Sequence, residues 1–519
     1  MADSLAVQQP TQAGAESRSG HRREIDWFIV ALLLGVTAYL YLNLFAFPNT
    51  PFLLGGDQTY FWMNAQRMLH GDRIYQDFFQ FTPPGTDLFY LGLFKLFGLQ
   101  VWITNVAVLA LGVALCCVCF SLASDIMDRP MALLTTALFL TLAYGRQLNG
   151  THHWFSVLAV MSAVKISGQQ RVNGGILFAG GLLGIASFFT QTRGVTALLA
   201  FAAFLTWRRS WAKKPMRDLL RSQLQLLLGF VSVLLLLNAH FIATVGLKQL
   251  WYFQVTYVER YMVHGIQTQF MGLPAALTLR TLPNLAPYLV VYMLLPAIYP
   301  VALWQCWRGR RSPALPWEHL TLLSMSGSFL LLEVASSLNW LRLFAVSMPG
   351  IILFIWALGR TGKDRRYAIA LMWMVVAGLA VRQTWLRHSQ QEVITETPGG
   401  QIAAAPRAYE KLRWMMQHIE PGQLFFQASG PSIYLPLQLR NPLFMDAVET
   451  NQQTRPEYIQ LTIQQLEAKQ IKLVLWSPRL DNADDHPTEE AIAALRNYLR
   501  ERYIRVHVFS DQDVVWERK

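Results

Sequence analysis

The sequence has few charged residues, few cysteines and none of the common nucleotide-binding motifs. Asp, Glu, Lys and Arg make up only 15% of its 519 residues, whereas 53% of the residues are hydrophobic and 17 are tryptophan. Because a soluble domain carries about 25% charged residues, this composition indicates an integral membrane protein. The chain has no P-loop, no Rossmann glycine motif, no zinc-ligand spacing and no internal repeat, so none of the functions that these motifs mark is indicated.

The four cysteines are poorly placed for a disulfide framework or a metal site. Cys116, Cys117 and Cys119 lie inside an apolar run, and Cys306 lies beside a basic segment. None of them is placed to form an external disulfide. The three clustered thiols lack ligand partners, and a packed or lipid-facing thiol is the ordinary case.

The positive net charge is explained by membrane topology. The chain carries 44 Lys and Arg against 32 Asp and Glu, a formal net charge of +12. In a soluble protein this excess would suggest a nucleic-acid partner, but no nucleic-acid-binding motif is present, and we expect no such partner. Lys and Arg collect in the cytoplasmic loops of membrane proteins. We expect residues 1–24 to be a cytoplasmic tail, followed by a retained anchor, because no cleavable signal peptide precedes it.

The apolar runs predict an all-α membrane domain over residues 25–386. The long runs are 27–47, 101–123, 222–246, 284–304 and 317–336, and the shorter ones are 84–97, 131–147, 153–166, 174–190, 194–207, 342–359 and 367–386. Each long run approaches the ~20 residues that a helix needs to cross a bilayer core. The basic segments 21–23, 208–217, 307–311 and 363–366 should all be cytoplasmic. Twelve crossings cannot place them together, whereas about eleven can, if 84–97 is re-entrant, interfacial or continuous with the next helix.

This topology places two long loops and the end of the chain outside. The external segments are 48–100, 149–153, 190–193, 247–283 and 387–519. In the last of these, helices are expected near 404–419, 456–469 and 488–503, and strands near 424–428, 471–476, 504–510 and 513–517. This alternation predicts a small extracytoplasmic α/β domain with its own core.

The first external loop combines acidic groups with aromatic residues at the membrane surface. Asp57 follows directly after an apolar segment, where its carboxylate could meet a lipid-borne and a water-soluble substrate. The run 58–69 predicts a short interfacial helix that ends near Gly71. Asp77 follows, and Pro83-Pro84-Gly85 then forces an extended or turned backbone.

The order of residues in this loop resembles that of a known family. The resemblance is carried by Asp57, Tyr60, Ala65, Leu69-His70-Gly71-Asp72, Tyr75-Gln76-Asp77-Phe78, Pro83-Pro84-Gly85 and Leu96-Phe97-Gly98. Over about 45 residues the loop resembles that of the GT-C membrane glycosyltransferases, and within them the bacterial family 39 and aminoarabinose-transferase-like branch, relatives of the protein O-mannosyltransferases. The resemblance implies a bacterial inner-membrane enzyme that moves a sugar, with inversion, from a polyprenyl-phosphate carrier to a lipid, glycan or protein acceptor outside the cytoplasm.

The resemblance also assigns roles to the acidic residues of the loop. Asp57 occupies the position of the general base, which takes the proton of an acceptor hydroxyl; the alternative is a carboxylate that caps the following helix. Asp77 positions the acceptor, coordinates a cation or caps a turn. Tyr60 is a candidate substrate-binding residue. Asp72 and Asp87 are expected to face solvent.

The lipid phosphate of the donor needs fixed cations. Arg193 in TQTRG and Arg342 in LNWLRLFAVSMPG are the candidates, with snorkelling from a helix end as the alternative for each. Glu333 lies deep in an apolar run, which predicts a functional role with a partner such as Arg342.

Two histidine positions complete the expected site. His152 and His153 stand where many members of the resembled family have a second Asp, so a neutral imidazole would form the hydrogen bond there. His264 lies in the loop 247–283, which is either an interfacial aromatic belt or a flap over the donor. No ligand cluster in the sequence requires a metal and no metal-binding residues are predicted, and the resemblance leaves a divalent cation open.

Two rival functions remain compatible with the sequence. A transporter or flippase of lipid-linked sugars would have a similar polar cavity, but the chain lacks paired broken spans in two halves. A non-catalytic subunit of an envelope-assembly complex would not depend on Asp57.

Overall fold

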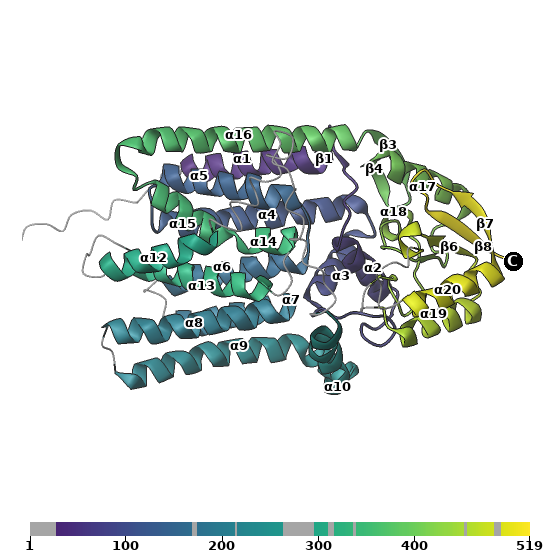
Figure 1. The fold of residues 1–519 in the computed structure, drawn as a ribbon, viewed down its shortest axis with the longest axis horizontal. Coiled ribbons are helices and arrows are strands. Elements are labelled where there is room, and N and C mark those ends of the chain that lie inside the picture. Colours follow the sequence, from purple (N-terminus) through teal and green to yellow (C-terminus); the bar gives the residue numbers. More distant parts are fainter. Residues whose placement is uncertain are drawn as a thin grey trace, which may run out of the picture.

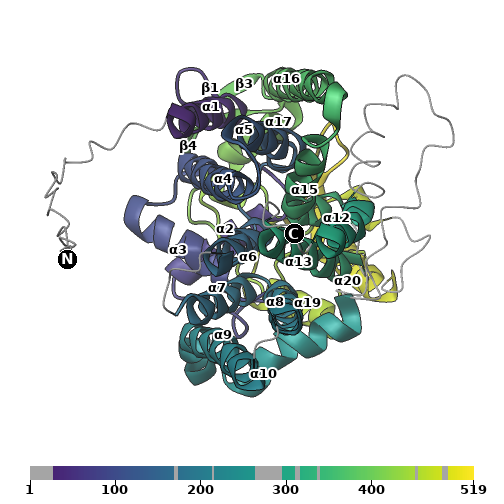
Figure 2. The same ribbon diagram turned by 90° about the vertical axis from the view of Figure 1, so that its left-hand side faces the viewer.

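The structure is a computed structural model that describes residues 27–168, 174–212, 215–262, 295–309, 316–335, 339–450, 454–481 and 489–519. Its larger part is a bundle of helices whose axes run roughly along the long axis of the molecule (Figure 1). These are α1 (Trp27–Leu44), α4 (Val101–Ser124), α5 (Arg129–Phe139), α6 (His152–Gly168), α7 (Gly175–Phe189), α8 (Gln191–Ala212), α9 (Met216–Thr244), α12 (Leu295–Gly309), α13 (Trp317–Ala335), α14 (Trp340–Val346), α15 (Met348–Leu358) and α16 (Arg365–Gln390). Viewed from one end, α6 lies in the middle, with α1 and α16 at one edge and α9 at the opposite edge (Figure 2).

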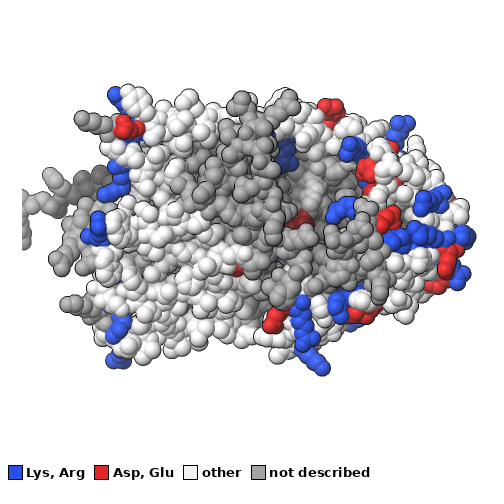
Figure 3. All heavy atoms as spheres, viewed as in Figure 1, with Lys and Arg blue, Asp and Glu red and all other residues white. Residues whose placement is uncertain are grey.

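Several of these helices are suited to a membrane. By length and composition, α1, α4, α9 and α16 can cross a bilayer, and α14 with α15, bent by 55°, forms a fifth candidate span among the described residues. On the face shown in Figure 3, a broad band with few charged side chains separates two charged ends. These features fit a membrane-embedded bundle. The expected number of about eleven spans stays a prediction.

The two ends of the bundle differ in the way that the sequence predicts. The turns from α8 to α9 and from α15 to α16, which contain two of the basic segments, lie at the same end (Figure 1). The opposite end carries the first loop and the C-terminal domain. These two segments are therefore grouped as expected, whereas the grouping of all four segments and the assignment of this end to the cytoplasm stay predictions. Segment 21–23 lies outside the described residues.

The first external loop lies between the bundle and the C-terminal domain. It contains β1 (Phe45–Ala46), β2 (Thr50–Pro51), α2 (Gln58–Leu69) and α3 (Gly85–Phe97). The bounds of α2 are those predicted, and Gly71 follows it with a φ of +99°, a conformation that favours glycine. Helix α3 lies beside α2 (Figure 1). The short helices α10 (Leu247–Trp251) and η3 (Tyr252–Met262) follow α9 at this end, and the rest of the predicted loop 247–283 lies outside the described residues.

The C-terminal domain contains the expected alternation of helices and strands. Its elements are β3 (Val393–Thr397), β4 (Gly400–Ala404), α17 (Pro406–His418), β5 (Phe426–Gln427), α18 (Tyr434–Leu437), α19 (Pro456–Ala468), β6 (Leu473–Trp476), η7 (Pro478–Leu480), α20 (Glu489–Arg502), β7 (Tyr503–Val508) and β8 (Val514–Arg518). The main sheet has the order β5-β6-β8-β7, with only β5 and β6 parallel. The β3–β4 hairpin was not predicted. Leu53 of the first loop donates its backbone N–H to Ala403 of β4, at 2.8 Å, so this hairpin joins the domain to the loop.

Candidate active site

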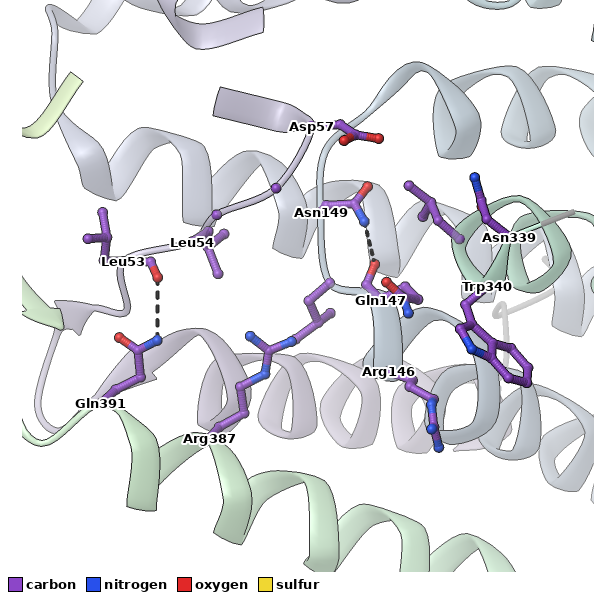
Figure 4. A pocket seen from close by; sticks show the side chains of 14 residues that line it. Leu53, Leu54, Asp57, Arg146, Gln147, Asn149, Asn339, Trp340, Arg387 and Gln391 are labelled. Atoms are coloured by element: carbon purple, nitrogen blue, oxygen red, sulfur yellow. Dashed lines mark hydrogen bonds between the residues drawn. The ribbon is translucent and has the colours of Figure 1, made fainter. Parts of the chain in front are cut away.

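A polar pocket of about 550 Å³ lies where the helical bundle meets the first external loop (Figure 4). Its lining comes from the first loop, the turn before α6, the start of α14 and the end of α16. The residues are Leu53, Leu54, Gly55, Gly56, Asp57, Arg146, Gln147, Leu148, Asn149, Asn339, Trp340, Leu341, Arg387 and Gln391. Asp57 lies at the top of the pocket in Figure 4, and Arg146 and Arg387 lie lower. One carboxylate, two guanidinium groups and four side-chain amides therefore share one cavity.

Asp57 directs its carboxylate into this pocket. The residue precedes α2 with helical backbone angles, and its side chain makes no capping hydrogen bond to the helix within the described chain. The capping alternative is therefore wrong. The side chain is open to the pocket, but protein surrounds the pocket, and this burial raises the pKa of Asp57, whereas the nearby Arg342 guanidinium lowers it. A carboxylate without a fixed partner and with a raised pKa is suited to accept a proton.

The turn that carries Arg146, Gln147 and Asn149 has an irregular backbone. The α5 helix passes into a π-helical segment, η1 (Leu140–Tyr144), and then into the 3₁₀ turn η2 (Gly145–Gln147). Single π-helical turns inside helices often occur at functional sites. Gly150 follows, where an added Cβ would overlap the Tyr90 hydroxyl. Only glycine fits this close approach.

Hydrogen bonds hold this turn against the first loop. The Gly150 N–H donates to Gln58 Oε1 at 3.0 Å, and the Tyr90 hydroxyl donates to the Gly150 carbonyl at 3.0 Å. Asn149 donates to the carbonyl of Gln147 at 3.0 Å, as Figure 4 shows. Because Gln58 directly follows Asp57 in the sequence, the same contacts fix the turn relative to the carboxylate.

Arg146 and Arg387 are the two pocket residues that sequence reasoning missed. None of the hydrogen bonds within the described part of the chain involves either guanidinium group, and Arg146 lies 5.8 Å from the centre of the Phe344 ring. Each arginine stands at the end of an apolar run, in 131–147 and just beyond 367–386. This position is a weak signal, since an arginine at a helix end usually snorkels to the interface.

Arg193 and Glu333 form a buried ion pair outside the pocket lining. Arg193 has no exposed surface, and its Nη2 lies 3.3 Å from Glu333 Oε2. Its Nη1 donates to the carbonyl of His153 at 3.0 Å and to Ser156 Oγ at 3.1 Å. The sequence favours Arg342 as the partner of Glu333, but Arg193 makes the ion pair, because α8 packs on α13 at this level. Arg342 remains close enough to interact electrostatically with both Glu333 and Asp57.

The two histidines lie between this ion pair and α2. The rings of His152 and His153 are 3.9 Å apart, and His152 packs edge-on against Phe61 of α2, at 5.4 Å. The Nδ1 atom of His153 lies 3.4 Å from Arg193 Nη1. The structure thus brings together His152, His153, Arg193 and Glu333, but none of them lines the pocket. Their predicted contacts with substrate stay predictions.

The other acidic residues of the first loop have protein partners. Asp77 accepts a hydrogen bond from the Arg73 backbone N–H at 2.7 Å, and its carboxylate lies 3.2 Å from Arg73 Nε. Partial burial alone would raise the pKa of Asp77. The hydrogen bonds and the charge of Arg73 outweigh it, so the pKa is lowered. Asp72 pairs with Arg67 at 2.9 Å. Asp77 does not line the pocket, and its contacts fit the turn-capping alternative.

The expectation that Asp87 faces solvent is wrong. The residue is fully buried in α3, where Gln80 donates to its carboxylate at 3.2 Å. This burial raises the pKa of Asp87 well above its ordinary value, and the neighbouring Asp446 acts in the same direction. The sequence around Asp87 indicates a polar position but carries no information on Asp446, which acts on it from the C-terminal domain.

The Tyr60 hydroxyl makes a hydrogen bond to a residue far along the chain. The Tyr60 hydroxyl donates to Glu449 Oε1 at 3.0 Å, across 389 sequence positions. Glu449 was not predicted as a site residue. His264 lies outside the described residues.

The described residues contain no group of three or more His, Cys, Asp or Glu side chains that could hold a metal ion. In the pocket itself, Asp57 is the only carboxylate among the lining residues. A divalent cation in a protein prefers several oxygen ligands. The residues of this lining therefore do not fit such a cation.

The comparisons with known proteins identify the fold. No protein-family model matches the chain, and no curated protein sequence matches it. Among solved structures, ArnT from Cupriavidus metallidurans in the apo state has a TM-score of 0.62 at 14% identity and covers 94% of this chain and 97% of its own. ArnT bound to undecaprenyl phosphate has a TM-score of 0.61 at 15% identity and covers 95% and 98% of the two chains.

A second protein with a related fold is the oligosaccharyltransferase from Archaeoglobus fulgidus, in complex with Zn and sulfate. It has a TM-score of 0.53 at 13% identity, and the match covers 95% of this chain and 73% of that protein. ArnT and the oligosaccharyltransferase are both members of the GT-C superfamily. The chain therefore has the fold of the GT-C membrane glycosyltransferases.

Proposed function

We propose that the protein is an inner-membrane glycosyltransferase that moves a sugar from a polyprenyl-phosphate carrier to an acceptor on the extracytoplasmic side of a bacterial membrane. The observation that carries the proposal is the pocket, in which an unpaired Asp57 faces two arginines within a GT-C fold. A donor of this class is supported by ArnT, whose fold is similar and whose structure has been solved with bound undecaprenyl phosphate. The sugar and the acceptor are left open.

The chemistry starts at Asp57. As an acceptor hydroxyl attacks the anomeric carbon, its O–H bond breaks and the proton passes to the Asp57 carboxylate. The bond between the anomeric carbon and the phosphate oxygen breaks at the same time, and its electron pair stays on the phosphate. Attack from the face opposite to the leaving phosphate inverts the anomeric centre. A raised pKa makes Asp57 a better proton acceptor than an ordinary aspartate.

The charge that develops on the leaving phosphate needs fixed cations. Arg146 and Arg387 line the pocket and are the groups that we assign to this phosphate. Arg342 contributes positive potential near Asp57. We propose that Arg193, which is engaged by Glu333, supports the site from behind through His153. The amides of Gln147, Asn149, Asn339 and Gln391 are suited to hydrogen-bond sugar hydroxyls.

A transfer assay tests the proposal. The purified protein in lipid is given radiolabelled polyprenyl-phosphate sugars and a crude envelope extract as acceptor. Asp57→Asn should lower the rate of transfer by about 10²–10⁴-fold, because the general base is lost. Asp218→Asn, at the exposed start of α9 and at the other end of the bundle, should leave the rate unchanged. If wild type binds a donor but moves no label from it, the transferase proposal fails and translocation of lipid-linked sugars becomes the function to test.

A further inference from the structure

The segment 439–449 of the C-terminal domain packs against helix α2. Gln66 donates to the Leu439 carbonyl at 2.8 Å, Arg67 donates to the Leu443 carbonyl at 2.5 Å, and the Tyr60 hydroxyl donates to Glu449 Oε1 at 3.0 Å. The three partners of α2 thus all lie within this one segment. This contact attaches the C-terminal domain to the helix that starts at Asp57.

The contact through Tyr60 brings a second carboxylate, that of Glu449, to the side of α2 on which the catalytic base lies. Tyr60 follows Asp57 by three positions, which is one turn of the helix, so the two side chains lie on the same side of α2. Because Tyr60 holds Glu449 by a hydrogen bond, the Glu449 carboxylate also lies on this side. Glu449 is only half-buried and does not line the pocket, so it is not placed to touch the reacting atoms.

We propose that Glu449 is a positioning residue of the C-terminal domain whose carboxylate, held by Tyr60, acts on the Asp57 base. This inference rests on the proposed function, since it gives Asp57 the role of the base. It makes the C-terminal domain a part of the catalytic centre.

The electrostatics support this role. A negative charge near a carboxylate disfavours the ionised form and raises its pKa. Burial raises the pKa of Glu449, the Tyr60 hydroxyl and Arg479 lower it, and Asp57 raises it, which indicates that the two carboxylates interact. Arg342 from α14 is the positive charge that acts on Asp57, and Arg146 from η2 and Arg387 from α16 line the same pocket. The Glu449 charge would act on Asp57 in the direction opposite to that of Arg342.

The test measures the protonation of Asp57 directly. The full-length protein in detergent is treated with a carbodiimide, which reacts with protonated carboxyl groups, over a range of pH, and the Asp57 peptide is quantified by mass spectrometry. In Glu449→Gln the midpoint of labelling should move to lower pH, because removal of the negative charge lowers the pKa of Asp57. Glu457→Gln removes an exposed carboxylate from α19 and should keep the wild-type midpoint. Glu449→Asp retains the negative charge, so its labelling midpoint should lie close to that of wild type.

A midpoint for Glu449→Gln that equals those of wild type and Glu457→Gln overturns the proposal. If Glu449→Gln does not fold, Tyr60→Phe is measured instead, since it releases Glu449 without removing the charge, and an unchanged midpoint in that variant also overturns the proposal. The acidic limb of the transfer rate against pH should move with the labelling midpoint. A labelling shift without any transfer would refute the proposed function but not the coupling, and transfer without a labelling shift would refute the coupling alone.

Discussion

Two groups of charges at the end of the bundle that carries the C-terminal domain have opposite surroundings. In the first, Arg193 is fully buried and its donors are engaged by Glu333, His153 and Ser156. In the second, Asp57, Arg146 and Arg387 share an open pocket and have no hydrogen-bond partners for their charged groups among the described residues. A satisfied charge stabilises the fold, whereas an unsatisfied charge in a cavity is available to a ligand. Both groups look alike in the sequence, so the surroundings decide which one binds.

The largest effect is expected from breaking the first group. Arg193→Gln leaves the Glu333 carboxylate without its ion-pair partner in a buried setting, and the loss of unfolding free energy should be about 3–5 kcal/mol. Thermal unfolding in detergent measures it. Adding Glu333→Gln to the variant removes the uncompensated charge and should recover a large part of the loss. Additive losses in the double variant would contradict the pairing.

Arg387→Gln should show the opposite pattern. The residue lines the pocket, so its loss should leave the melting temperature within the range of an ordinary surface change, about 0.5 kcal/mol. The rate of transfer at low donor concentration should fall about 10–100-fold, because one charge-assisted contact to the phosphate is lost. Arg146→Gln should behave in the same way. A large loss of stability with normal donor binding would instead show that these arginines stabilise the fold, as Arg193 does.

Arg67 and Asp446 form a third charged pair. We expect the substitution of Asp446 to have the smallest of these effects. Asp446 is buried, and its Oδ1 lies 3.7 Å from Arg67 Nη1. Burial raises the pKa of Asp446 to about 7, although the charge of Arg67 alone would lower it. The folded protein therefore holds a proton on Asp446 that the unfolded chain releases near pH 4, so the contribution of Asp446 to stability falls as the pH rises from about 4 to 7.

Between pH 5 and pH 8 the melting temperature should fall by roughly 2 °C or more through this residue. Asp446→Asn should remove this pH dependence. Its melting temperature should then be close to that of wild type at pH 5 and above it at pH 8. Asp218→Asn, which changes an exposed residue, should keep the wild-type pH dependence. Parallel pH curves for wild type and Asp446→Asn would contradict the assignment.

Local features of the molecule could be predicted from the sequence, and features made by distant contacts could not. The bounds of α2 and the alternation in the C-terminal domain follow from periodicity within short windows. Asp57 could be named because its motif is local. Arg146 and Arg387 reach the pocket only because α16 and the turn after α5 converge on the first loop, and no single window of sequence contains that information.

The same reason accounts for the errors. Asp87 was expected to face solvent, but it is buried, Gln80 donates to its carboxylate, and Asp446 of the C-terminal domain acts on it. Arg342 was expected as a partner of Glu333; Arg193, 140 positions away, makes the ion pair, and Arg342 interacts electrostatically with the same carboxylate. In both cases the packing of helices and of the C-terminal domain decides the environment of the charge.

The hydrogen bond between Tyr60 and Glu449 has a consequence for the biogenesis of the protein. The two residues are 389 positions apart, so the bond cannot form until nearly the whole chain has been synthesised. A chain that ends before Glu449 would already carry Asp57 and both pocket arginines but would lack this carboxylate. By the coupling proposed above, its base would be weaker, so full activity would require the complete C-terminal domain.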